Sequence, residues 1–171
     1  HVYKMNLDPL KEFAPVIQLS RQPIVLAAHP SLGVASLSEL IALAKRQPGL
    51  RYATGSGVGA QHMVAQWFAS IVGITLEQVP YRGGAPALND LIAGHVKLGS
   101  LGSTPLIPHH KSGTLRLLAQ STETRSPTLP DVPTFMEAGV ADFESSSWVA
   151  ILAPAATPRV VIDKLNRELN A

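Results

Sequence analysis

Residues 50–98 decide the fold and read LRYATGSGVGAQHMVAQWFASIVGITLEQVPYRGGAPALNDLIAGHVKL. Three short runs in and just beyond this stretch are typical of buried strands: residues 50–54, 76–81 and 96–102. Glycine-containing turns separate them from two segments whose apolar residues have helical spacing, residues 60–72 and 83–94. Strands that alternate with helices predict βαβ units, and hence an α/β fold with a largely parallel sheet and helices on both faces.

The flanking sequence continues this pattern. Further strands are predicted at residues 14–20, 22–29, 114–121 and 146–155. A helix is predicted over residues 37–47 with Ser36 or Ser38 as its N-cap, and a last helix begins with Thr157 as N-cap and Pro158 at its first position. Residues 103–113 are predicted to form a short helix interrupted by Pro108, and the proline-rich residues 125–139 a surface loop.

Composition bounds the class of protein. Of the 171 residues, 46% are hydrophobic and 15% charged, so a sizeable core is feasible and disorder is not expected. The formal net charge is only +2 and the basic residues are scattered, which argues against a nucleic-acid partner. There is no cysteine, so disulfides and thiolate chemistry are excluded. No apolar run approaches the roughly 20 residues that a membrane span needs.

The glycine loop after residues 50–54 fits no nucleotide or nucleophile motif. Gly55, Gly57 and Gly59 form G-x-G-x-G, whereas the dinucleotide fingerprint is G-x-G-x-x-G and a P-loop ends in Gly-Lys-Ser/Thr. A nucleophile elbow needs G-x-S-x-G, but Ser56 directly follows Gly55. Two interpretations stay open at this loop: a bare strand-to-helix turn, and an anion site formed by Ser56 and the amides at a helix N-terminus.

Two further loops favour the anion interpretation. Residues 82–85 and 100–104 also follow predicted strands, precede predicted helices, and are rich in Gly, Ser and Thr. In sheets of this kind ligands bind at the carboxyl ends of the strands. The three loops together therefore predict a polar cleft wall, rich in hydrogen-bond donors and suited to a carboxylate.

Neither a catalytic nor a metal centre is predicted, and no cofactor is expected. The adjacent His109 and His110 would face different directions on a helix, and His62 is expected to be a hydrogen-bonded core or cap residue. The sequence contains no H-E-x-x-H motif and no cluster with metal-ligand spacing. Carboxylates such as Asp90 and Asp131 are dispersed, and no nucleophile lies beside a base. We therefore interpret the chain as a binding protein and not an enzyme.

The motifs YATGSGVGAQHMVAQWFA and GITLEQVPYRGGAPALNDLIAGHV, with DPLKEFAPV before them and RSPTLPDVPTFMEAG and LAPAATPRVVIDKLN after them, resemble the Bug family. The resemblance covers essentially the whole chain in order. Bug proteins are exported solute receptors of tripartite tricarboxylate transporters. The resemblance thus implies a periplasmic type II binding protein of two domains, which closes on a small carboxylate and delivers it to membrane transporter subunits.

The resemblance also implies that the chain holds only part of such a receptor. Residues 1–21 would be a crossover segment from a missing first domain, residues 22–141 the second ligand-binding domain, and residues 142–171 a return crossover strand with a truncated first-domain helix. The signal peptide and most of the first domain are expected to be missing. With one wall of the site present, the isolated chain is expected to bind its ligand weakly or not at all.

Position by position, the first two loops would supply these ligand contacts: Thr54, Ser56, Gly57, Gly59, Tyr81, Gly83, Gly84 and Ala85. The third loop would add Ser100, Gly102 and Ser103, but it departs from the family pattern. Many members carry Phe-Asp-Asn at 100–102 and an acidic residue at 97, where this chain has Ser-Leu-Gly and Lys. Because leucine cannot receive an ammonium group, the expected ligand is a dicarboxylate or an aromatic carboxylate and not an amino acid.

Two alternatives of other classes remain at this point. A small α/β enzyme acting on a carboxylate would need a positioned acid or base in the cleft, and Ser56-dependent turnover of esters would reveal it. A sensor or interaction domain would use the same fold without transport. Genes for transporter subunits or for a kinase beside this gene would separate the transport role from the sensor role.

Overall fold

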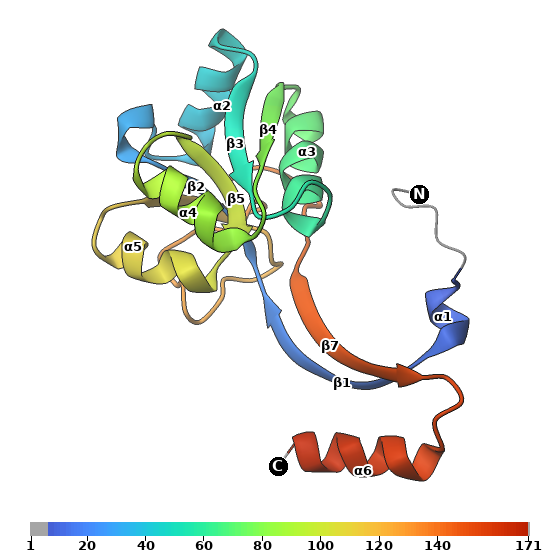
Figure 1. Cartoon of the computed structure of the whole chain (residues 1–171). Helices are drawn as coiled ribbons and strands as arrows, with labels where there is room; N and C mark the ends of the chain where they lie inside the picture. Colours follow the sequence, from blue (N-terminus) through green and yellow to red (C-terminus); the bar gives the residue numbers. More distant parts are fainter. Residues whose placement is uncertain (1–6, 171) are drawn as a thin grey trace. The chain divides into compact units, whose positions relative to one another are not determined.

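The computed structural model describes residues 7–170. The chain divides into two compact units: Gln22–Ser147 forms the larger, and the segments before and after it form the smaller. The larger unit is built around a five-stranded sheet, and the smaller around a two-stranded one (Figure 1).

Five strands form the sheet of the larger unit: β2 (Ile24–Ala28), β3 (Leu50–Thr54), β4 (Leu76–Pro80), β5 (Leu98–Gly102) and β6 (Arg116–Gln120). Their order is β4-β3-β5-β2-β6. β3 pairs parallel with β4 and β5, whereas β2 pairs antiparallel with β5 and β6. Four strands therefore run in one direction and β2 runs against them. The carboxyl ends of β3, β4, β5 and β6 meet the start of β2 at one edge, called the carboxyl edge below.

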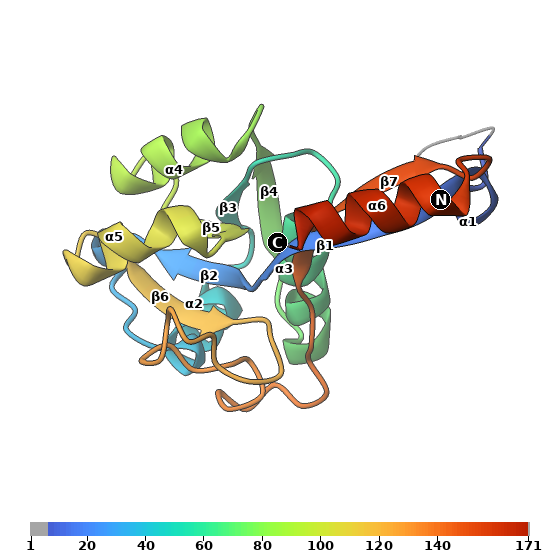
Figure 2. The same cartoon turned by 90° about the horizontal axis from the view of Figure 1, so that it is seen from below.

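Helices cover both faces of this sheet (Figure 2). On one face α2 (Leu37–Arg46) and α3 (Ala60–Val72) pack with Ile24, Leu26 and Ala28 of β2. On the other face α4 (Gly84–Ile92) and the 3-10 helix η2 (Thr104–Leu106) pack with Val25 and Ala27. Alternate residues of β2 thus face opposite cores, as the two-residue period of a strand requires. The predicted α/β class with helices on both faces is confirmed.

Capping residues and prolines set the helix boundaries, and they correct two of the boundaries predicted from the sequence. Ser36 caps α2, since its Oγ accepts the Glu39 N–H at 3.2 Å. Pro108 does not interrupt a helix: it lies at the start of α5 (Ile107–Lys111), where a missing N–H costs nothing. The last helix, α6 (Arg159–Leu169), begins one residue later than predicted, with Pro158 at the N-cap and no side-chain cap.

The smaller unit has little core. It consists of α1 (Pro9–Glu12), α6, and a two-stranded sheet of β1 (Phe13–Gln22) and β7 (Ser147–Pro154). Its buried cluster is limited to Val16, Ala153 and Ile162. Across residues 7–170, none of the helices has both the length and the apolar character that crossing a membrane requires.

An aromatic cluster anchors the core beneath α3 and provides a test of the packing. Phe135 is fully buried, 5.3 Å from the Phe68 ring and 4.3 Å from the Phe143 ring between centroids. We expect Phe135→Ala to lower the free energy of unfolding by about 3–5 kcal/mol because it leaves a cavity. Urea unfolding measures the change. Met63→Ala, at a 64% exposed position of α3, is the control and should change stability by less than about 0.5 kcal/mol.

Candidate ligand-binding site

The predicted loops meet at a topological switch point of the sheet. After β3 the chain forms α3 and returns as β4 on one side; after β4 it forms α4 and returns as β5 on the other side of β3. Such a reversal opens a crevice at the carboxyl ends of the strands, which is where α/β sheets bind ligands. The first glycine loop (residues 55–59), the second glycine loop (residues 81–83) and the third loop (residues 102–103) lie at this edge.

The first and second glycine loops are in direct backbone contact. The Tyr81 N–H donates to the Thr54 carbonyl and the Gly83 N–H to the Gly55 carbonyl, both at 2.9 Å. A Cβ added to Gly55 would lie 2.8 Å from the Gly84 nitrogen. Glycine is therefore required at position 55 for the two loops to approach. The structure thus brings the predicted residues of the first two loops together.

Within the first glycine loop, hydrogen-bonding groups divide into an inward and an outward set. In the inward set, the Thr54 hydroxyl donates to the Ser56 carbonyl at 2.7 Å. Gln78 Nε2 donates to the Thr54 hydroxyl oxygen at 2.7 Å and to the Ser56 carbonyl at 2.9 Å. The Gly55 N–H donates to Gln61 Oε1 at 2.7 Å. Thr54 is fully buried. The geometry gives it the role of shaping the loop, with its hydroxyl already bonded within the protein.

The outward groups are the N–H donors at two helix starts. The first backbone bond at the start of α3 runs from Met63 N–H to the Gly59 carbonyl at 3.0 Å, so the N–H groups of residues 60–62 precede the helical pattern. Neither α3 nor α4 has a side-chain cap, and both begin after a glycine, Gly59 or Gly83. Gly57, Gly84 and Ala85 are exposed. Both helix starts thus offer uncapped donors and a partial positive charge.

The third loop differs from the first two because its groups already have partners. The fully buried Ser100 lies in β5, and its hydroxyl donates to the Gln61 carbonyl at 2.7 Å. The Ser103 N–H donates to the Pro23 carbonyl, and its hydroxyl lies 3.5 Å from Gln22 Oε1. Gln22 Oε1 also accepts the Thr104 hydroxyl at 2.8 Å. The structure does not bring Ser100 and Ser103 to the first two loops as unbonded donors.

Sequence reasoning missed four polar residues at this edge. Gln61 and Gln78 hold the first glycine loop, and Gln22 fills the third loop beside Gly102. Within residues 7–170, Thr122 Oγ1 is the buried side-chain polar atom that lacks a hydrogen-bond partner. Thr122 follows β6, and its neighbour Ser121 donates its N–H to the Ile24 carbonyl, so it also lies at the carboxyl edge. Of these four residues, Thr122 alone had a sequence signal, because it directly follows the strand predicted at residues 114–121.

Two polar contacts position the elements behind the loops. The Tyr81 hydroxyl donates to Asp90 Oδ2 at 2.6 Å, tying the second glycine loop to α4. Burial raises the pKa of Tyr81 to about 12, and the Asp90 carboxylate acts in the same direction. Hydrogen bonds from Tyr81 and His95 lower the pKa of Asp90. On α3, His62 Nδ1 lies 2.9 Å from the Tyr52 hydroxyl, which confirms His62 as a hydrogen-bonded residue.

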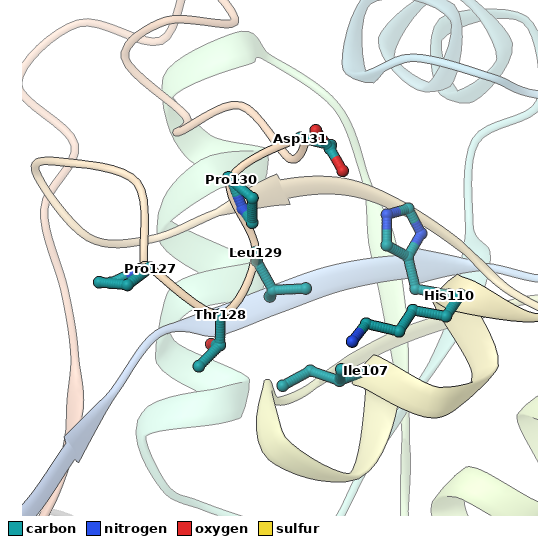
Figure 3. Close-up of a pocket in the computed structure, with 8 residues that line it drawn as sticks. Ile107, His110, Pro127, Thr128, Leu129, Pro130 and Asp131 are labelled. Carbon is teal, nitrogen blue, oxygen red and sulfur yellow. The ribbon is translucent and has the colours of Figure 1, made fainter.

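A separate hollow of about 390 Å³ lies between α5 and the loop after β6 (Figure 3). It is lined by Ile107, His110, Lys111, Pro127, Thr128, Leu129, Pro130 and Asp131. None of the predicted ligand contacts is among these residues. Within residues 7–170, no group of three His, Cys, Asp or Glu side chains could hold a metal ion.

The chain is similar to curated relatives in sequence and to solved proteins in structure. Protein BugT of Bordetella pertussis is 35% identical over 162 residues, which cover 94% of this chain and 50% of BugT. A protein from R. palustris, solved with adipate, is 37% identical with a TM-score of 0.86, over 97% of this chain and 56% of that one. MatC from Rhodopseudomonas palustris, solved with bound malate, is 26% identical with a TM-score of 0.88, over 99% and 58%.

These likenesses define the class of protein first. The fold is that of the type II periplasmic binding proteins. Residues 1–171 match the family described as tripartite tricarboxylate transporter family receptor, TctC, and the chain belongs to this family. The resemblance seen in the sequence is confirmed. The chain spans about half the length of the curated relatives that it matches.

The contact between the glycine loops predicts different effects at two neighbouring glycines. Gly55→Ala forces a methyl group against the backbone of residues 83–84, and we expect a loss of about 1–3 kcal/mol of stability. Gly57→Ala is the matched control, because a Cβ there has nothing within 4 Å and φ does not lie between +20° and +160°. Urea unfolding compares the two variants. Equal stability losses would contradict the close approach at Gly55.

The Tyr81–Asp90 pair predicts a high-pH transition. Because the pKa rises from 10.0 to about 12 in the folded state, Tyr81 contributes stability that is present below pH 10 and lost as the pH rises through 12. Burial also raises the pKa of Tyr52, so the tyrosinate absorbance that appears near pH 12 should be smaller by one group in Tyr81→Phe than in the wild type. Asp90→Asn should lower the pKa of Tyr81, since the carboxylate no longer opposes ionisation. A transition unchanged in Asp90→Asn contradicts the pairing.

Proposed function

We propose that this chain forms one wall of a carboxylate-binding site in an extracytoplasmic solute receptor, which delivers its ligand to the membrane subunits of a tripartite tricarboxylate-type transporter. One observation carries the proposal: two uncapped helix starts, α3 and α4, are held side by side at the carboxyl edge by the backbone contact between Gly55 and Gly83. Converging N–H donors and helix dipoles favour an anion there.

The proposed contacts follow from which groups remain available. Ser56, Gly57 and Gly59 of the first loop, with Gly84 and Ala85 at the start of α4, would bind the carboxylate. The Gly83 N–H already donates to the Gly55 carbonyl, and we assign Gly83 to joining the two loops. Thr54, Tyr81 and Ser100 already have partners inside the protein, and we assign them to shaping the site. Gly102 and Ser103 would border it beside Gln22.

The charge of the loops limits the ligand. No Asp or Glu occurs in residues 55–59, 81–83 or 102–103. Asp90, the carboxylate bonded to Tyr81, is engaged. Leu101 packs in the core below α4, so position 101 does not face the loops. With no acid in these loops to meet an ammonium group, we propose a dicarboxylate or an aromatic carboxylate over an amino acid. Adipate and malate, bound by the two related proteins, are of the first kind.

A ligand panel tests the proposal on the longest natural form of this protein. Adipate, malate and benzoate should raise the melting temperature, because a ligand at 100 times its Kd adds about 2.7 kcal/mol of stability. Adipamide, which has the same length and no charge, should not. Tight binding of aspartate or glutamate would overturn the ligand class. Failure of every carboxylate to bind, at millimolar concentration, would overturn the site.

A matched pair of serines on α3 and its loop locates the site. Ser56→Ala removes a hydroxyl donor at the proposed anion, and we expect the Kd to rise by about tenfold to a hundredfold, as for one hydrogen bond to a charged group. Ser70→Ala, at an exposed position near the other end of α3, should leave the Kd unchanged. Calorimetry with adipate measures both. Equal effects would place the ligand elsewhere.

A further inference from the structure

The peptide between Ser56 and Gly57 is held in one orientation from inside the protein. Its carbonyl oxygen accepts the Thr54 hydroxyl at 2.7 Å and Gln78 Nε2 at 2.9 Å. Gln78 Nε2 also donates to Thr54 Oγ1 at 2.7 Å, so the three groups form a closed triangle of hydrogen bonds. Gln78 stands on β4 directly opposite Tyr52 of β3, so sheet pairing fixes the position from which it donates.

The orientation of this carbonyl determines where the next N–H points. A trans peptide places its C=O and N–H on opposite sides, and within residues 7–170 no cis peptide occurs. With the Ser56 oxygen directed toward buried Thr54, the Gly57 N–H is directed away from the core. Gly57 is exposed, and a Cβ built on it meets nothing within 4 Å. The N–H therefore faces the open side of the loop.

Glycine makes the opposite orientation accessible. Because Gly57 has no side chain, the Ser56–Gly57 peptide can rotate with little steric cost. A rotated peptide would turn the Ser56 oxygen outward, where it would repel a carboxylate, and turn the Gly57 N–H inward. The two donors from Thr54 and Gln78 disfavour that state. Holding a flexible loop in its bound form before the ligand arrives strengthens binding by removing the cost of ordering it.

We propose that Gln78, acting together with Thr54, is a positioning residue that presets the Ser56–Gly57 peptide for anion binding. Gln78 does not touch the ligand; it acts through the orientation of the Gly57 N–H. The inference rests on the proposed carboxylate site and adds a residue that determines how strongly that site binds.

The chain offers a matched control for Gln78. Gln66 is also partly buried, and its Nε2 also donates to one hydroxyl and one carbonyl, Tyr52 Oη at 3.0 Å and Leu76 O at 3.2 Å. Leu76 is the first residue of β4, at the opposite end of that strand from the glycine loop, and neither bond of Gln66 reaches the backbone of the loop. Gln78→Met and Gln66→Met therefore remove similar hydrogen bonds, of which only the Gln78 pair orients the loop.

The experiment measures the Kd for adipate and the melting temperature of each variant in the longest natural form of this protein, with malate as the second probe. Gln78→Met should raise the Kd by about tenfold or more, since it weakens the anion's contact with a preset N–H. Gln66→Met should lower the melting temperature comparably but change the Kd by less than about twofold. A loss of stability alone cannot raise the Kd in Gln78→Met and leave it unchanged in Gln66→Met.

A second pair of variants keeps the test informative if Gln78→Met does not fold. Thr54→Val removes the hydroxyl with little change of shape and should raise the Kd, whereas Thr54→Ser retains the hydroxyl and should restore binding. Equal Kd values for Gln78→Met and the wild type, or equal losses in both glutamine variants, would overturn the positioning role alone. A wild type that binds no carboxylate would overturn the proposed function, and this inference with it.

Discussion

The carboxyl edge of the sheet depends on one close approach, that of Gly55 to the backbone of residues 83–84. Two hydrogen bonds join the loops at this point, and there is no room for a side chain. The contact sets α3 and α4 beside each other although they cover opposite faces of the sheet. Two helix starts, each a weak anion site alone, can then act on the same charged group.

Around that contact, glutamine side chains form hydrogen bonds that hold the loops in place. Gln61 and Gln78 hold the first loop from the helix side and from the strand side, and Gln22 holds the third. Amide side chains suit this task because each carries both donors and an acceptor without charge. A charged residue in the same positions would compete with the ligand or with the helix dipoles. Neutral scaffolding leaves the backbone N–H groups as the source of positive potential.

The sequence predicted the elements well and the roles of individual polar residues less well. Strong apolar periodicity and the Ser36 cap located most helices and strands, and the glycine spacing correctly pointed to loops at strand ends. The antiparallel direction of β2 was not predictable, because a strand buried on both faces has the same apolar pattern in either direction. Thr54 and Ser100 were predicted as ligand contacts, and the structure places both within strands with hydroxyls that bond inside the protein. Gln78 carried no signal, since its partners are distant in sequence.

The reversed direction of β2 has a mechanical consequence. Because β2 starts where its neighbours end, the chain enters the larger unit at Gln22, beside the loops. It leaves past Ser145, whose carbonyl accepts the Ser121 hydroxyl at 2.6 Å at the same edge. Both ends of the larger unit are thus tethered next to the loops, through Thr104 on entry and Ser121 on exit. A force applied to either connecting strand would therefore be transmitted to the loops through only a few bonds.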